Sequence, residues 1–284
     1  PEDMCADGFI PTEKNSDGKY SVEVGEYVVE MTVNGVTTKY KTINEAIEAA
    51  PIASYAEGKA GNSAELASIK LLNDAKGGFD VGVETGSLDT WKIQNIEIDL
   101  NGKTLTLGHP LVGSTGSKTS GIRVLAYSKL SIKNGTVSGL NSNALRGLQN
   151  YGATVVENVV FEEMGSAYDT VGNFGLLELK GNTIVPKGTE SAILNSTYMY
   201  SDDSQVGVEL KIEEGTVKVG KIVVDLSEST HPQTGTTNTS NPVIAISSGE
   251  IEEIVSEGSD KELVGGVTGG TFDKAVPEDM CAED

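Results

Sequence analysis

The sequence predicts an all-β protein made of short parallel strands stacked in successive coils, a β-solenoid. Two observations predict this fold: short runs of alternating apolar residues fill most of the chain, and a turn marked by Gly or Asn recurs between them. The clearest copy is NIEIDLNGKTLTL, from Asn95 to Leu107, with Asn101-Gly102 at its turn. We interpret this turn as a corner that sends the strand onto the next face of a coil.

Weaker copies of this unit follow at steps that fit one coil of a solenoid. Aligned on the turn, the copies lie at Gly102, Gly135, Val159, Thr183, Gly215, Gly249 and Gly270. The steps are 33, 24, 24, 32, 34 and 21 residues, so a period of about 24 residues carries insertions at one corner. Each coil presents inward aliphatic side chains that only the next coil can cover.

Polar residues recur in the same alignment. Asn occupies the turn in four copies, at Asn101, Asn134, Asn158 and Asn182. Stacked Asn side chains can form hydrogen bonds between coils and tolerate the left-handed turn conformation, so we predict a structural ladder here. The alignment also places Ile132 beside Asp99, and Lys133 beside Glu157 as a solvated ion pair between coils.

A pair of antiparallel β-sandwich domains is the alternative fold, since it also uses short alternating strands. It explains the repeat of about 24 residues less well. The two folds differ at Ile96 and Ile98, which have parallel neighbours from Leu130 to Ile132 in a solenoid and antiparallel partners from Thr104 to Thr106 in a sandwich. In the solenoid, the polar stretch 224–242 is a long insertion between coils.

The N-terminal part carries signals of a different kind. A polar turn at 15–18 separates two short apolar runs and predicts a hairpin, and Asn34-Gly35 predicts a second one. Thr42 and Glu45 form a capping box that opens a short amphipathic helix, which Pro51 ends. We expect this helix to cover the open end of the strand stack.

After the helix we expect a loop over 52–66, with a helical turn near Ala64–Ala67.

The hexapeptide PEDMCA stands at residues 1–6 and again at 277–282. This recurrence predicts one unit of a tandem array, whose start overlaps the end of a preceding repeat. We therefore divide the chain into 1–41, an N-terminal hairpin region, 42–67, the capping helix and loop, 68–276, the strand stack, and 277–284, the start of the next repeat. Cys5 and Cys281 then give one Cys per unit, which is no disulfide framework.

Composition excludes several classes of function. Asp and Glu number 42 against 21 Lys and Arg, a net charge of −21, which disfavours binding to nucleic acid or to anionic membranes. No run reaches the 18 apolar residues of a membrane span, so we expect no membrane insertion. The first residues show no signal-peptide pattern, and we expect a mature or excised segment.

The order of these motifs resembles the pectin-lyase-like right-handed parallel β-helix modules of large surface proteins from gut anaerobic bacteria. The motifs that carry the resemblance are KTINEAIEAAP with DLNGKTLTL, and GGTFD with SDGKYSV. The resemblance covers most of the chain and implies a right-handed parallel β-helix at the bacterial cell surface. The loop of roughly 15 residues after Pro51 departs from the pattern of these modules, which pass almost directly from helix to strand.

Few residues suggest chemistry. Arg123 and Arg146 lie 23 residues apart and could grip a carboxylate-bearing sugar from neighbouring coils, but we interpret them as surface residues without acidic partners. His109 and His231 precede prolines and lack spaced partners, so neither zinc nor a catalytic triad is expected. The glycines of GGVTGGTF join two strand runs and serve turns. We predict no catalytic residues and no metal site.

The best candidate for binding is TYMYSDDS, residues 197–204. Tyr198 and Tyr200 alternate onto one face, and Asp202 and Asp203 follow them. Exposed aromatic rings beside carboxylates suit stacking and hydrogen bonding to a sugar, or weak Ca²⁺ binding, which is the only cofactor that we consider. The alternative is that the two Tyr rings pack over a loop.

Together these features predict a non-catalytic extracellular repeat module, a stalk or adhesin segment. Its expected partners are neighbouring tandem repeats of the same chain, and a host glycan or host surface protein. A carbohydrate-binding module is one alternative. A polysaccharide lyase or glycosidase is another, and it predicts acidic and basic residues clustered on one face across three consecutive coils.

Overall fold

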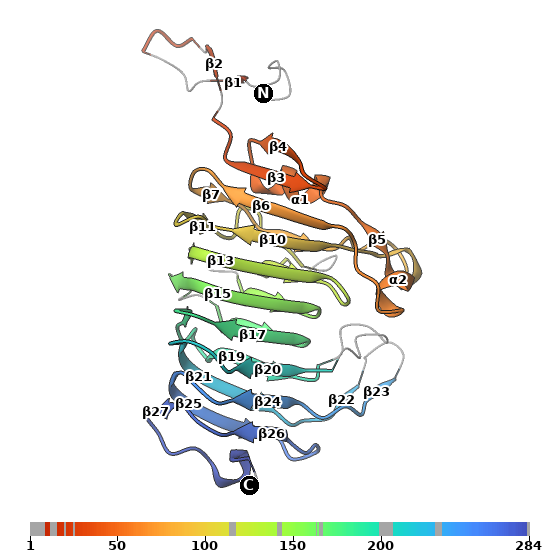
Figure 1. Ribbon diagram of the computed structural model, residues 1–284, viewed down its shortest axis with the longest axis vertical. Helices are drawn as coiled ribbons and strands as arrows, with labels where there is room; N and C mark the ends of the chain where they lie inside the picture. The colour runs from red at the N-terminus through yellow and green to blue at the C-terminus, as the bar shows by residue number, and fades with distance from the viewer. Residues whose placement is uncertain are drawn as a thin grey trace.

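The computed structural model describes residues 9–11, 16–19, 21–24, 26–113, 118–140, 144–162, 164, 167–198, 207–230 and 235–282. The protein is mostly β, with 49% strand and 7% helix, and one large, largely parallel sheet contains most of the strands. Figure 1 shows these strands stacked along the long axis of the molecule, from β3 near the N-terminus to β27 near the C-terminus.

The parallel strands form three ladders, in each of which a strand pairs with strands before and after it in the stack. The first ladder contains β6 (Leu66–Leu71), β10 (Asn95–Asp99), β13 (Lys129–Ser138), β15 (Ala153–Glu162), β17 (Leu176–Lys180), β20 (Glu209–Ile212), β24 (Val243–Ile246) and β26 (Val264–Val267). The second contains β7 (Ala75–Lys76), β11 (Thr104–Thr106), the later parts of β13 and β15, β18 (Ile184–Val185), β21 (Lys218–Asp225), β25 (Glu250–Glu257) and β27 (Thr271–Phe272). The third contains β8 (Phe79–Val81), β12 (Ser120–Val124), β14 (Arg146–Asn150), β16 (Asp169–Asn173), β19 (Ser191–Ser196) and the later parts of β21 and β25.

The register of the first ladder decides between the two predicted folds. Ile96 and Ile98 pair in parallel with Leu130 and Ile132, as the stacked arrangement requires, so the antiparallel sandwich is wrong for this region. Asp99 pairs with Lys133, which corrects the expected alignment with Ile132 by one residue.

The core lies between the ladders. Strands of the first ladder alternate buried and half-exposed residues, because one face points inward and the other outward. The inward column of this ladder is almost fully buried: Ile69, Ile98, Ile132, Val156, Leu179, Ile212 and Ile246. These aliphatic side chains belong to one continuous hydrophobic cluster that runs from Val29 to Met280.

The turn between the first two ladders confirms three of the four predicted Asn positions. Asn101, Asn134 and Asn158 have φ angles of 52°, 61° and 54°, in the left-handed region that Asn tolerates. The Asn134 amide donates to Asp99 Oδ1 at 3.2 Å, which links two layers. Asn182 does not hold this position: Gly181, with φ of 60°, takes the turn, and the Asn182 backbone N–H donates to Asn158 Oδ1 at 2.9 Å.

The N-terminal hairpins are present as predicted. β1 (Phe9–Pro11) pairs with β2 (Val22–Val24), and β3 (Val29–Val33) pairs with β4 (Val36–Tyr40) around Asn34-Gly35. β3 also pairs antiparallel with β6, so this hairpin closes the first end of the sheet. Figure 1 shows β1 and β2 standing apart from the stack.

The helix α1 (Ile43–Ala49) begins at the predicted capping box of Thr42 and Glu45. Ile43, Ala46 and Ile47 are buried, as its amphipathic pattern predicts.

The segment after α1 differs from the expected loop. It contains β5 (Ala53–Ser54) and a second short helix, α2 (Tyr55–Lys59), which begins at another capping box formed by Ser54 and Glu57. Ala64–Ala67 is not a helical turn, because β6 has already begun at Leu66. Tyr55 packs into a small second core, and the nearby η2 (Leu88–Thr90) and β9 (Lys92–Ile93) border it.

The polar insertion near residues 224–242 contains a short antiparallel ribbon, β22 (Ser229–Thr230) with β23 (Thr237–Asn238). Asn238 is buried and its amide donates to the Thr197 carbonyl at 2.9 Å, so the insertion packs beside the end of β19. At the other end of the chain, η3 (Glu278–Met280) follows β27. In the described part of the chain, no helix has the length and apolar character of a membrane span.

Candidate functional site

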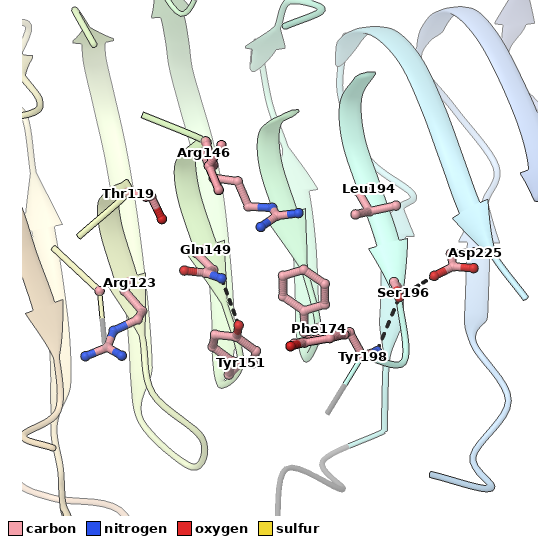
Figure 2. A pocket seen from close by; sticks show the side chains of 12 residues that line it. Thr119, Arg123, Arg146, Gln149, Tyr151, Phe174, Leu194, Ser196, Tyr198 and Asp225 are labelled. Carbon is pink, nitrogen blue, oxygen red and sulfur yellow. Dashed lines mark hydrogen bonds between the residues drawn. The ribbon is translucent and has the colours of Figure 1, made fainter. Parts of the chain in front are cut away.

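A cleft of about 420 Å³ lies on the outer side of the third ladder. Figure 2 shows its side chains projecting to the same side from successive strands. The lining residues come from or near β12, β14, β16, β19 and β21: Gly113, Thr119, Arg123, Leu145, Arg146, Gln149, Tyr151, Phe174, Leu194, Ser196, Tyr198 and Asp225. The cleft therefore crosses several layers of the stack, as an extended ligand requires.

The positions of the aromatic side chains follow from a second Asn ladder, which is buried. Asn150 and Asn173 end β14 and β16, Asn195 is the last residue but one of β19, and the three pair in register and are fully buried. The Asn150 amide donates to Asn173 Oδ1 at 2.8 Å, and the Asn173 amide donates to Asn195 Oδ1 at 2.7 Å. Because Tyr151 and Phe174 each directly follow one of these paired Asn residues, they stand at equivalent positions in neighbouring layers.

Three aromatic rings form a row along the cleft. Tyr151 and Phe174 are stacked, with ring centres 5.0 Å apart and an angle of 22° between the rings. Tyr198 meets Phe174 edge to face at 5.8 Å. Tyr151 and Phe174 are buried, whereas Tyr198 is 48% exposed. The row of rings therefore extends from the protein interior to the solvent-exposed ring of Tyr198.

Arg146 lies beside this row. Its guanidinium carbon is 5.1 Å from the centre of the Phe174 ring, within the range of a cation–π contact. A Cβ atom on Gly172 would come within 2.3 Å of Arg146 Cδ and Nε, so the arginine crosses β16 where only glycine leaves room. Arg146 Nη2 is 3.2 Å from Asp169 Oδ2, and its Nε is buried without a hydrogen-bond partner among the described residues.

Asp169 supports this arginine from the start of β16. Burial raises the pKa of its carboxyl group, while the hydrogen bond from Ser191 and the charge of Arg146 act in the opposite direction. The Ser191 hydroxyl donates to Asp169 Oδ1 at 2.7 Å. The side chain of Arg146 is therefore held in place from one side, and its Nε remains able to donate.

Arg123 differs from the predicted surface residue, because only 1% of it is exposed. It makes a two-pronged contact with Asp80, with Nε to Oδ1 at 2.9 Å and Nη2 to Oδ2 at 2.8 Å, and its Nη1 donates to Glu84 at 2.7 Å. Nor does it stack directly with Arg146, since Arg123 pairs with Gln149 and Arg146 with Ser120. Two carboxylates neutralise this arginine, so we assign it a structural role at the edge of the cleft.

The remaining polar groups are partly paired with one another. Gln149 donates through Nε2 to the Tyr151 hydroxyl at 2.8 Å. The Ser196 hydroxyl donates to Asp225 Oδ2 at 2.8 Å and accepts from the Tyr198 backbone N–H at 3.2 Å. These hydroxyl, amide and carboxylate groups beside aromatic rings are the kind of lining that orients a small polar ligand.

Of the residues predicted for binding, Tyr198 lines the cleft. Tyr200, Asp202 and Asp203 lie outside the described residues, as does His231. Lys133 is in register with Glu157 as expected, but its ion pair is with Glu97, at 3.1 Å. The sequence analysis did not predict Tyr151 and Phe174, the aromatic partners of Tyr198. The signal for them in the sequence is an Asn followed by an aromatic residue, at 150–151 and again at 173–174.

The cleft contains one carboxylate among its described lining residues, Asp225. Within the described ranges, no group of three or more His, Cys, Asp or Glu residues could hold a metal ion. Comparison with protein-family models, with curated proteins and with solved structures finds no match to this chain.

Proposed function

We propose that the chain is a right-handed parallel β-helix of the pectin-lyase-like type, one unit of a tandem bacterial surface protein, and that its cleft binds a glycan without cleaving it. The order in which the chain visits the ladders supports the fold. β10, β11 and β12 belong to the first, second and third ladder, and β13 returns to the first ladder beside β10. A chain that moves one strand further along the stack after each circuit is a solenoid.

The row of Tyr151, Phe174 and Tyr198 is the observation that carries glycan binding. Sugar rings have apolar faces that stack on aromatic side chains, and Tyr198 offers such a face at the opening of the cleft. Ser196 and Asp225 stand next to it and can form hydrogen bonds to sugar hydroxyl groups. Since the cleft crosses several strands, it fits a chain of sugars better than a single one.

The same lining favours binding over cleavage. Hydrolysis of a glycosidic bond by most enzymes requires two carboxyl groups on either side of the bond. Asp225 is the carboxylate that lines the described cleft, and it accepts hydrogen bonds from Ser196 and from the Ser227 backbone. A lone carboxylate of this kind suits ligand orientation.

A role as a repeat unit at the cell surface rests on other features. The hexapeptide PEDMCA at both 1–6 and 277–282 supports a tandem array, and the resemblance of the motifs supports an extracellular surface protein. In such an array each unit adds one cleft, so several units engage one glycan with increased avidity.

The test is binding of the purified chain to an array of plant, mucin and bacterial glycans. We expect binding that Tyr198→Ala weakens about tenfold or more, a free energy of about 1.4 kcal/mol. Tyr168→Ala is the matched control, because Tyr168 is 51% exposed and does not line the cleft. The proposal fails if no glycan binds, or if both variants bind equally. Release of shorter sugars from a bound glycan would instead make the chain an enzyme.

A further inference from the structure

The second copy of the hexapeptide is an integrated part of the fold at the C-terminal end of the stack. Met280 is fully buried and belongs to the main hydrophobic cluster. Cys281 forms a parallel bridge with Val267, the last residue of β26, and the Ala282 N–H donates to the Val267 carbonyl at 3.2 Å. The hexapeptide thus continues the first ladder by one short step and covers its last strand.

The sheet leaves space for this contact. Gly266 lies in β26, and a Cβ atom there would meet the Ala282 backbone nitrogen at 2.6 Å and its Cα at 2.8 Å. A residue with a side chain at this position would prevent the hexapeptide from approaching the strand. Glu278 and Asp279 are exposed on the same segment, so its apolar anchor is Met280 and its remaining contacts are made by backbone.

The identical hexapeptide at residues 1–6 lies outside the described part of the chain, but its sequence contains every group that makes these contacts. Met4 corresponds to the buried Met280, and Cys5 and Ala6 correspond to the residues that pair with Val267. The described copy at 277–282 closes the C-terminal end of the stack, and the copy at 1–6 carries the same six residues.

We propose that PEDMCA is a docking segment, and that residues 1–6 of one copy of this chain close the C-terminal end of another copy in the way that residues 277–282 close their own. Units then join head to tail, with the hexapeptide belonging to the sheet of the unit that precedes it. This inference rests on the tandem array of the proposed function, and it is independent of glycan binding. The binding assay reports on the cleft, and the assays below report on the end of β26.

The first experiment uses the full chain with Met280→Asp, which places a charge where the core needs a methionine. We expect this variant to lose its own closing segment and to assemble into head-to-tail dimers and longer forms, measured by light scattering under reducing conditions. Met4→Asp with Met280→Asp should remain monomeric, as should the unmodified chain and Met4→Asp alone. A monomeric Met280→Asp variant, or equal assembly of the double variant, overturns the proposal.

The second experiment covers the case in which Met280→Asp does not fold. Met280→Ala removes most of the buried side chain and should lower the melting temperature by about 4 °C or more. A free peptide VPEDMSA, in which Ser replaces the reactive Cys, should raise the melting temperature back towards that of the unmodified chain when added in excess. The same peptide with Asp in place of Met should not. If neither peptide raises the melting temperature, the hexapeptide is not a docking segment.

Discussion

The first and third ladders bury their strands in different ways. Along β10 of the first ladder, buried and half-exposed residues alternate, whereas all five residues of β12 and all five of β16 in the third ladder are buried. The outer face of the first ladder is open to solvent. The outer face of the third ladder is covered by its own arginine and aromatic side chains, which also line the cleft. Polar groups should therefore matter much more for stability on the third ladder than on the first.

The largest effect is expected at Asn173, in the middle of the buried Asn ladder. Asn173→Ala removes the donor to Asn195 Oδ1 and to the Glu209 carbonyl, and the acceptor of the Asn150 amide. Unpaired buried polar groups are costly, so we expect the free energy of unfolding to fall by about 3 kcal/mol or more. Urea denaturation measures it. Asn182→Ala, at an exposed turn, is the control and should change stability by no more than about 0.5 kcal/mol.

The buried ion pairs of the third ladder come next. Arg123→Met keeps most of the side-chain volume but leaves Asp80 and Glu84 without their cation. Both carboxylates have side chains about one-quarter exposed, at 28% and 25%, so water replaces part of the lost interaction. We expect a loss of about 2 kcal/mol, below the full cost of breaking a buried pair. An unchanged urea midpoint would show that the arginine adds nothing to stability.

The same contrast explains which parts could be predicted from the sequence. The first ladder could be predicted because its one exposed face makes apolar and polar residues alternate, as around Ile96 and Ile98, and because Asn101-Gly102 marks the turn after the strand. In β12 and β16 of the third ladder both faces are buried, so segments such as Asp169–Asn173 show no alternation of apolar and polar residues. Of the cleft residues, Tyr198 was predicted to bind, because an exposed aromatic residue beside acids is visible in one segment. Arg123 and Arg146 were considered as a grip on a sugar carboxylate but interpreted as surface residues. Tyr151 and Phe174 lie far from Tyr198 in the sequence, and only the register of separate strands brings them beside one another.

Asp169 provides a pH test of burial on the third ladder. Its ordinary pKa of 3.8 applies to the unfolded chain, and burial raises the pKa in the folded state. As the pH rises from about 3.8 through the raised value, the unfolded chain loses its proton first, so this group lowers stability over that window. Relative to Asp169→Asn, the native protein should lose stability as the pH rises there, measured by urea denaturation at stepped pH. If the free energy of unfolding of the native protein, relative to that of Asp169→Asn, stays constant or increases with pH, the raised pKa of Asp169 is contradicted.

The smallest effect should come from the ion pair on the first ladder, between Lys133 of β13 and Glu97 of β10. Its side chains are 28% and 34% exposed, and their nitrogen and oxygen atoms are 3.1 Å apart. Lys133→Met matches Arg123→Met in chemistry but acts on an open face, where water and salt screen the pair. We expect a change of about 0.5 kcal/mol or less in urea denaturation. Equal losses for the two variants would mean that the faces do not differ in the way their burial suggests.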